Sequence, residues 1–227
     1  MARKKIVLFI VEGINDKTCL ESVLEKIIES DEVRFQVTNG DITSRSDIDE
    51  YKIKNEVGKV VKAFKDKYHL ETGNFMEVVH IIDTDGLFLK EDFVKYADTE
   101  KTLYMEDGIY TDNVEGIAER NKKKSAVVER MTELGSVLKT IPYSVYYFSS
   151  NMDHVLHNDA NLQKEEKENL ADIFDEKYAD EPEKFIRFLS DSPFSVKGTY
   201  EETWDFIKMG KNSVQRYSNF GGYLRRR

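Results

Sequence analysis

The segment Ile6–Val11 is an unbroken run of six apolar residues, and it leads directly into Glu12-Gly13-Ile14-Asn15-Asp16. A strand that is apolar at every position is typical of a parallel sheet covered on both faces. A helical pattern follows, because apolar residues then recur at three- and four-residue spacing: Cys19, Leu20, Val23, Leu24, Ile27 and Ile28. The chain therefore begins with a buried strand and a helix, and the turn between them carries carboxylates.

The alternation of strand and helix continues along the next 140 residues. Residues 33–37 alternate as a second strand should, and a helix capped by Ser46 or Asp47 is expected to run to about residue 68. A third strand at 77–82 ends at Asp83-Thr84-Asp85-Gly86, and a fourth is expected at 144–149. This order predicts an α/β fold of the Rossmann-like class, a parallel sheet with helices on both faces.

The length of 227 residues suits one sizeable domain with a helical appendage. We predict a sheet domain over 1–155, interrupted by a mainly helical insertion at about 87–140, and a helical C-terminal region over 156–227. Within the insertion, 91–96 is expected to be a short helix, 102–110 a hairpin or loop, and 113–140 helical. The C-terminal helices are expected at 161–177, 181–190 and 201–208.

Composition and charge exclude several classes of protein. The net charge of −9 argues against a non-specific nucleic-acid coat, although a cluster of metal-binding acids would make a nuclease acidic too. Cys19 is the single cysteine, so an internal disulfide and a cysteine zinc site are excluded, and we expect a buried thiol. The apolar runs are too short for a membrane span. The N-terminal run is also too brief for a signal peptide, which predicts a cytoplasmic protein.

Carboxylates follow the first and third predicted strands. In an open parallel sheet, ligands bind outside the carboxyl ends of the strands, so Glu12 and Asp16 should face Asp83 and Asp85. Oxygen-rich clusters of this kind suit Mg²⁺ or Mn²⁺. Gly13 and Gly86 would let the backbone turn sharply and approach a ligand or substrate closely. The alternative is a solvated acidic rim on an ordinary doubly wound fold.

The pair of motifs Glu12-Gly13-x-x-Asp16 and Asp83-x-Asp85-Gly86 resembles the Toprim domain of topoisomerases, bacterial primases, OLD-family nucleases and small ribonucleases. The resemblance implies that Glu12 is a general acid or base, or a metal ligand, and that Asp83 and Asp85 carry Mg²⁺. Asp16 matches an additional acid of the primase and OLD branches.

The stretch YYFSSNMDHVL at residues 146–156 is similar to the last Toprim strand of OLD-type and defence-associated members. In those proteins an acidic residue opens the following helix, and Asp153 would match it as a metal ligand. Asn151 or Asp153 could instead be a helix cap.

The resemblance implies a Mg²⁺-dependent nuclease that cleaves phosphodiester bonds of DNA or RNA. The chain has no Walker A sequence, because Gly210-Lys211-Asn212-Ser213 is preceded by Asp205 where the motif needs glycine. A Toprim protein without an ATPase domain looks like the effector of a prokaryotic antiphage or abortive-infection system, controlled by a separately encoded ABC-type ATPase. The sequence leaves an oligomer open. The rival hypothesis is a non-catalytic module that docks a partner such as that ATPase.

Several basic residues have two interpretations each. Lys17 lies beside Asp16 and could neutralise a substrate phosphate or the acids. The clusters at 120–124 and 225–227 could touch phosphates or form a solvated surface and a fraying tail.

Other polar and aromatic residues are equally open. His154 and His157 could transfer protons, bind metal or simply pack. Asn39-Gly40-Asp41 could contact the nucleic acid, but a turn explains it better. The aromatic residues of 204–223 are better explained by packing than by partner docking.

Overall fold

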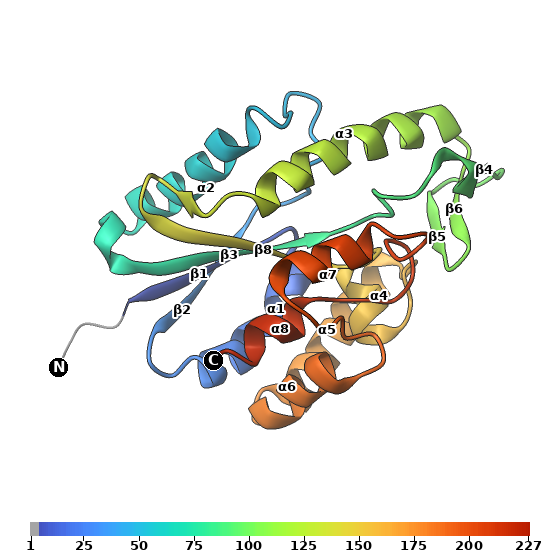
Figure 1. Cartoon of the computed structure of the whole chain (residues 1–227). Coiled ribbons are helices and arrows are strands. Elements are labelled where there is room, and N and C mark those ends of the chain that lie inside the picture. Colours follow the sequence, from blue (N-terminus) through green and yellow to red (C-terminus); the bar gives the residue numbers. More distant parts are fainter. Residues whose placement is uncertain (1–4) are drawn as a thin grey trace.

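A computed structural model of the protein describes residues 5–227, and its centre is a five-stranded sheet (Figure 1). Four neighbouring strands are parallel and only the short fifth strand is antiparallel. In spatial order the strands are β2 (Glu32–Val37), β1 (Ile6–Val11), β3 (Phe75–Asp83), β8 (Ile141–Phe148) and β7 (Ser136–Val137). The predicted α/β class is confirmed.

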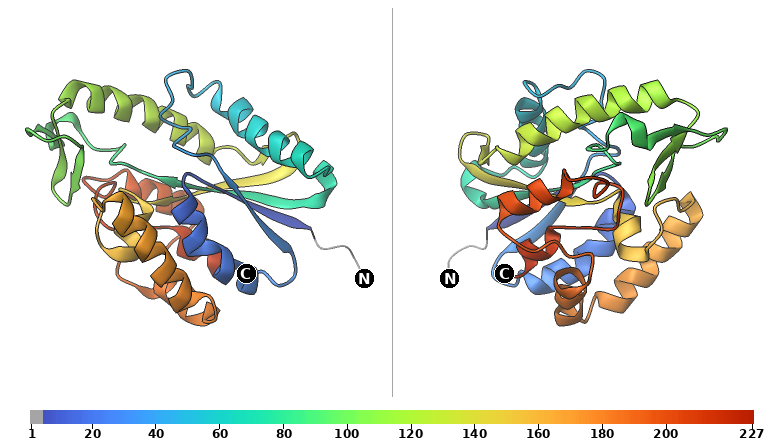
Figure 2. Two further views of the ribbon diagram at one scale, coloured as in Figure 1. Left: turned by 180° about the vertical axis from the view of Figure 1, so that it is seen from behind. Right: turned by 45° about the vertical axis from the view of Figure 1, so that its right-hand side comes forward.

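Helices cover both faces of the sheet, as the views in Figure 2 show. One face carries α2 (Ile53–Lys67) and α3 (Val114–Thr132). The other carries α1 (Ile14–Ile27), α5 (Lys164–Tyr178), α6 (Pro182–Asp191) and α8 (Phe220–Leu224). Successive residues of β1 point to opposite faces, so Leu8 joins the first core and Phe9 the second, and neither exposes any surface. This double coverage explains why the strand is apolar throughout.

The insertion contains a second sheet, so the prediction of a mainly helical insertion is only partly correct. Its strands are β4 (Val94–Tyr96), β6 (Gly108–Thr111) and β5 (Leu103–Met105), followed by α3. The predicted hairpin at 102–110 is confirmed by the antiparallel β5 and β6. The predicted helix at 91–96 is wrong: one 3₁₀ turn, Glu91–Phe93, precedes β4, because pairing with β6 satisfies that backbone instead.

The start of α2 also differs from the prediction. The helix begins at Ile53 and not after Ser46 or Asp47. The Asp49 carboxylate accepts hydrogen bonds from the backbone N–H groups of Tyr51 and Lys52 at 3.1 and 2.9 Å. This local turn competes with the helix, as short polar side chains commonly do.

The C-terminal region packs on the sheet and along its edge. Besides α5, α6 and α8 it contains α4 (Met152–His157) and α7 (Tyr200–Ile207). The segment 213–219 runs beside β8, where the Asn219 side chain accepts a hydrogen bond from the Tyr147 N–H at 2.9 Å. Trp204, Phe220 and Tyr223 are each at most 3% exposed, which confirms packing for the aromatic residues. The domain boundary at 155 stays a prediction.

The structure bears on the predictions about membrane spans and about the single cysteine. Within residues 5–227, no helix is long and apolar enough to cross a membrane. Cys19 is buried as expected, and burial raises the pKa of its thiol. Residues 1–4, which open the stretch considered as a signal peptide, lie outside the described residues.

Candidate functional site: an acidic cluster at the carboxyl edge of the sheet

The ends of β1 and β3 meet as the motif spacing predicts. These strands are parallel neighbours, and the backbone N–H of Asp83 donates a hydrogen bond to Glu12 Oε1 at 3.2 Å. The Asp83 side chain is held in turn by the start of α4, because Oδ1 accepts from the backbone N–H of Met152 at 2.9 Å. Two carboxyl groups from distant motifs are thus fixed side by side.

Asp16 lies in the first turn of α1 and closes back on the motif. Its Oδ2 accepts a hydrogen bond from the Gly13 N–H at 2.8 Å. Gly13 has φ −125° and ψ 166°, an extended conformation open to any residue, so the expected sharp glycine turn is wrong at this position. What Gly13 supplies is a backbone donor that positions the Asp16 carboxylate.

Gly86 makes the sharp backbone turn that was predicted for it, and close packing also requires a glycine there. Its φ is +70°, and a Cβ would lie 2.6 Å from Val214 Cγ1 and 2.7 Å from Ile109 Cδ1. Its N–H donates to the Ser213 carbonyl at 3.2 Å, and its carbonyl accepts from the Asn121 side chain at 3.2 Å. The predicted approach to a substrate is therefore replaced by close packing inside the protein.

A buried lysine holds the other half of the cluster together. The Lys124 ammonium lies 2.7 Å from Asp85 Oδ2 and 2.8 Å from Asp41 Oδ2, and its side chain exposes no surface. Asp41 also accepts hydrogen bonds from Thr43, through its backbone N–H at 2.7 Å, and from the hydroxyl of Ser44. Asp41 thus joins the cluster, and its interpretation as a simple turn residue is incomplete.

The role of Lys124 is not evident from the sequence, in which residues 120–124 form one basic cluster. This basic cluster folds inward: Arg120 donates to the Asp85 carbonyl at 2.7 Å, and Lys124 is buried. A signal was present, since Lys124 is three, four and seven residues before the buried Val127, Val128 and Met131. That spacing places it on the inward face of α3.

The two halves of the cluster differ in electrostatics. Burial, reinforced by the negative charge of Asp41, raises the pKa of Glu12 well above its usual value. Burial and the negative charges of Glu12 and Asp16 do the same for the pKa of Asp83. Burial also raises the pKa of Asp16 to about 6. Burial alone would raise the pKa of Asp41, but Lys124 and nearby hydroxyls lower it to about 2.

Asp153 stands beside Asp16, and its negative charge raises the pKa of Asp16 further. It forms an ion pair with Lys167 of α5 at 2.6 Å. The helix cap of α4 is Asn151, whose side chain accepts from the His154 N–H at 2.9 Å, so Asp153 remains free of that role.

A cleft opens beside the two aspartates that end β3. Its volume is about 260 Å³, and Asp83 and Asp85 line one side. Lys101 and Tyr104 of the insertion and Lys167 of α5 line it too, so two cations share the cleft with the acids. No sequence motif pointed to these residues, because three separate segments bring them together.

The remaining candidates lie elsewhere or are otherwise occupied. Lys17 pairs with Glu21 at 3.2 Å rather than with Asp16. Burial lowers the pKa of both His154 and His157. The His157 ring packs edge-on against Phe174, with ring centres 5.6 Å apart, which agrees with the packing interpretation.

The donor chemistry of the cluster fits a hard divalent cation. Glu12, Asp16 and Asp83 supply only carboxylate oxygens, and all three have raised pKa values that a nearby cation would lower. Their arrangement is not that of a closed ligand set, since residues 5–227 contain no group of three acidic, histidine or cysteine side chains placed to hold an ion together. A bound ion would need side-chain rotation or added water ligands.

Comparison of the chain with protein families, curated proteins and solved structures finds no match. The resemblance to Toprim domains therefore rests on the two acidic motifs and their strand-end positions, and it stays a prediction.

Proposed function

We propose that the protein is a Mg²⁺- or Mn²⁺-dependent nuclease that cleaves phosphodiester bonds of DNA or RNA. The observation that carries the proposal is the bond from the Asp83 backbone N–H to the Glu12 carboxylate, which holds together two buried acids with raised pKa values. Asp83 also lines the cleft. Such perturbed groups cluster at functional sites, because a merely structural role would be served better by neutral side chains.

Asp83, Glu12 and Asp16 are the residues that would hold the metal, with Asp153 as a neighbouring acid. A divalent ion bound there supplies stabilisation of charge on the attacking and leaving oxygens of a phosphodiester. Asp85, the second acid of the motif, pairs with Lys124 through Oδ2, so Oδ1 is the oxygen that could act as a ligand.

The other roles follow from charge and position. The raised pKa of Glu12 keeps a proton on its carboxyl group closer to neutral pH, which suits a general acid or base. Lys101 and Lys167 line the same cleft as the acids, and their ammonium groups would bind the phosphates that flank the cleaved bond.

The test is cleavage of plasmid DNA and of a tRNA-sized RNA with Mg²⁺ or Mn²⁺, and its loss in EDTA. Asp83→Asn and Glu12→Gln should each lower the rate by about 100-fold or more, as removal of an acid–base group commonly does. Asp172→Asn changes an exposed aspartate of α5 and serves as the matched control. Full cleavage by both site variants would contradict the assignment.

The cellular setting belongs to the same proposal. On the motif resemblance, we place the protein in the cytoplasm as an antiphage effector regulated by a separate ABC-type ATPase. Co-expression of the chain with such an ATPase should change its nuclease activity. Equal activity with and without the ATPase would remove this part while leaving the nuclease assignment intact.

A second candidate function is a non-catalytic module that docks a partner. It is favoured by Lys124, which already neutralises Asp41 and Asp85 without any metal. Titration calorimetry with Mn²⁺ separates the candidates. Millimolar or tighter binding that disappears in Asp83→Asn supports the nuclease, whereas no binding supports the docking module.

A further inference from the structure

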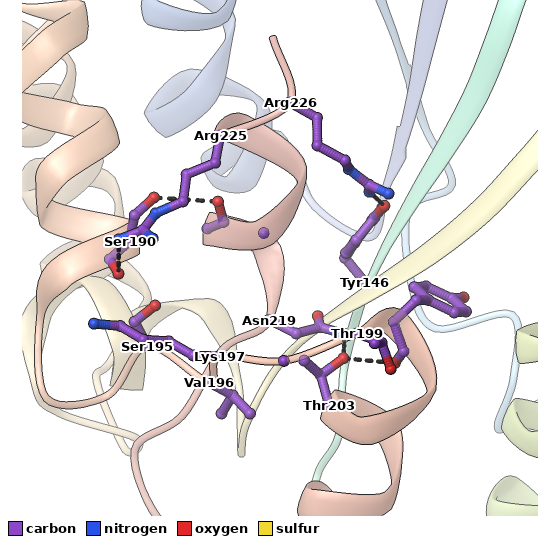
Figure 3. Close-up of a pocket in the computed structure, with 14 residues that line it drawn as sticks. Tyr146, Ser190, Ser195, Val196, Lys197, Thr199, Thr203, Asn219, Arg225 and Arg226 are labelled. Carbon is purple, nitrogen blue, oxygen red and sulfur yellow. Dashed lines mark hydrogen bonds between the residues drawn. The ribbon is translucent and has the colours of Figure 1, made fainter.

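A second cavity lies mostly in the C-terminal part of the chain (Figure 3). Its volume is about 350 Å³. Its walls come from Tyr146 of β8, the end of α6, the segment 195–200 and the residues around α8. It shares no lining residue with the cleft beside Asp83 and Asp85. It is a separate candidate binding site.

The charge of this cavity is opposite to that of the protein. Three cations line it, Lys197, Arg225 and Arg226, and no aspartate or glutamate does, although the chain carries a net charge of −9. Arg225 donates to the Ser190 carbonyl at 3.0 Å and pairs with Asp191, which neutralises it in part. The cavity is thus suited to an anionic ligand.

Two of the cations remain available to a ligand. Lys197 is exposed and forms no hydrogen bond or ion pair with the described residues. Arg226 donates one guanidinium N–H to the Tyr146 hydroxyl, as Figure 3 shows, and its other N–H donors are not used by that bond. Lys197 is the cation that a phosphate could contact without displacing an existing bond.

The cavity also offers aromatic and apolar surface on a fixed floor. The Tyr146 ring is only 3% exposed and meets the half-buried Tyr200 ring edge-on, with centres 5.8 Å apart. Val196 also lines the cavity. The Thr203 hydroxyl donates to the Tyr200 carbonyl at 2.7 Å and accepts from the Asn219 amide at 3.1 Å. These internal bonds hold the floor in place before any ligand arrives.

We propose that this cavity binds a nucleoside phosphate, with the phosphate at Lys197 and the base against the apolar wall that includes Tyr200. Inorganic phosphate would leave the apolar wall unused, and an uncharged nucleoside would leave the cations unpaired. A free nucleotide and the phosphorylated end of a strand share this chemistry. The proposal is independent of the nuclease activity, because no acid of the cluster takes part.

The first experiment is titration calorimetry of the full chain in EDTA, so that no metal can recruit nucleotides to the acidic cluster. AMP should bind about 10-fold more tightly than either adenosine or inorganic phosphate, which is the expected cost of losing one part of the ligand. A 5′-phosphorylated trinucleotide forms a second arm. Tighter binding of AMP indicates a free nucleotide, and tighter binding of the trinucleotide indicates a strand end.

Two variants change the cavity in different ways. Lys197→Glu reverses an exposed charge and should weaken AMP binding by about 10-fold or more, because a carboxylate would face the phosphate. Gly222→Leu places a side chain at the wall where a Cβ would meet no atom within 4 Å, so it should fold and obstruct the cavity.

Gly73→Leu is the matched control, since Gly73 is exposed, far from the cavity in sequence, and equally free of neighbours around a Cβ. It should bind AMP as the unaltered chain does. Absence of AMP binding at 1 mM, or binding unchanged in both cavity variants, would overturn the proposal.

Discussion

The acidic cluster has two halves that sit on the same edge of one sheet and differ in how their charge is balanced. In the paired half, the Lys124 ammonium lies within 2.8 Å of both Asp41 and Asp85. In the open half, Glu12, Asp16 and Asp83 have no lysine or arginine bonded to them within the described residues, and the pKa of each is raised. Both halves are shielded from water, so the difference in charge balance between them is due to the Lys124 ammonium.

The cation of the paired half comes from the insertion, because Lys124 belongs to α3. The motifs themselves supply only acids and backbone donors. The insertion therefore determines which carboxylates are paired with a cation of the chain itself. The carboxylates of the open half are left to pair with a cation from outside. On our proposal, the open half is where a metal acts and the paired half is structural.

The largest effect is expected from removal of that cation. Lys124→Met leaves Asp41 and Asp85 facing each other without compensation and should lower the free energy of unfolding by about 3 to 5 kcal/mol, as breaking a buried ion pair does. The measurement is urea unfolding at pH 7 in EDTA. Lys122→Met, an exposed position two residues earlier in the same helix, should change stability by at most about 0.5 kcal/mol.

A triple variant distinguishes charge from packing. Adding Asp41→Asn and Asp85→Asn to Lys124→Met removes all three charges and should recover much of the lost stability. If the triple variant is as unstable as Lys124→Met, the lysine stem rather than its charge supports the fold, and the contrast between the halves would lose its electrostatic basis.

Much of the open half could be predicted from the sequence, and little of the paired half. Glu12 directly follows a buried apolar strand and Asp83 ends another. The carboxyl ends of neighbouring parallel strands meet at one edge of the sheet, regardless of how the loops connect them. Lys124 is brought in by the path of a 19-residue helix across the sheet, which periodicity alone does not give. The cleft lysines, Lys101 and Lys167, depend on long-range packing in the same way.

The same distinction applies to the fold. The strands of the main sheet are long or continuously apolar, so their period was clear, and all four parallel strands were found. The insertion consists of three- and four-residue strands that are stable only when paired, so Val94–Tyr96 looked helical in isolation. The local sequence pattern predicts a strand correctly where the strand is buried along its whole length. It fails where a short strand forms only by pairing with another strand.

A smaller effect of opposite sign is expected in the open half. The pKa of Asp16 is raised to about 6, so its folded carboxyl group binds a proton more readily than in the unfolded chain. The associated stability is present below about pH 4 and is lost as the pH rises through 6. Asp16→Asn should therefore raise the free energy of unfolding by about 1 to 3 kcal/mol at pH 7, while the amide oxygen can still accept from Gly13.

The pH profile of thermal or urea unfolding in EDTA tests this prediction. The gain from Asp16→Asn should shrink between pH 6 and pH 4, whereas the exposed Asp172→Asn should show a flat difference. A loss of stability at pH 7 would show that the hydrogen bond from Gly13 outweighs the charge. The Asp16 carboxylate would then stabilise the fold, whereas the comparison of the two halves predicts that its uncompensated charge destabilises it.

The smallest effect concerns Lys167, a cation whose charge acts on Asp16 of the open half. It pairs with Asp153 at 2.6 Å while its side chain is 34% exposed, so water screens the pair and its coupling energy should be only about 0.5 kcal/mol. A double-mutant cycle of Lys167→Gln and Asp153→Asn measures that coupling.

Lys167 has a further influence, because its charge lowers the pKa of Asp16. In Lys167→Gln the pKa of Asp16 should rise further, measured by carboxyl-carbon NMR titration in EDTA. A matched Lys164→Gln, at an exposed position of the same helix, should leave it unchanged. A coupling of several kcal/mol, or a fall in the pKa of Asp16, would mean that Lys167 already neutralises the open half as Lys124 does the paired one. The two halves would then be alike, and the open half would have no need of an outside cation.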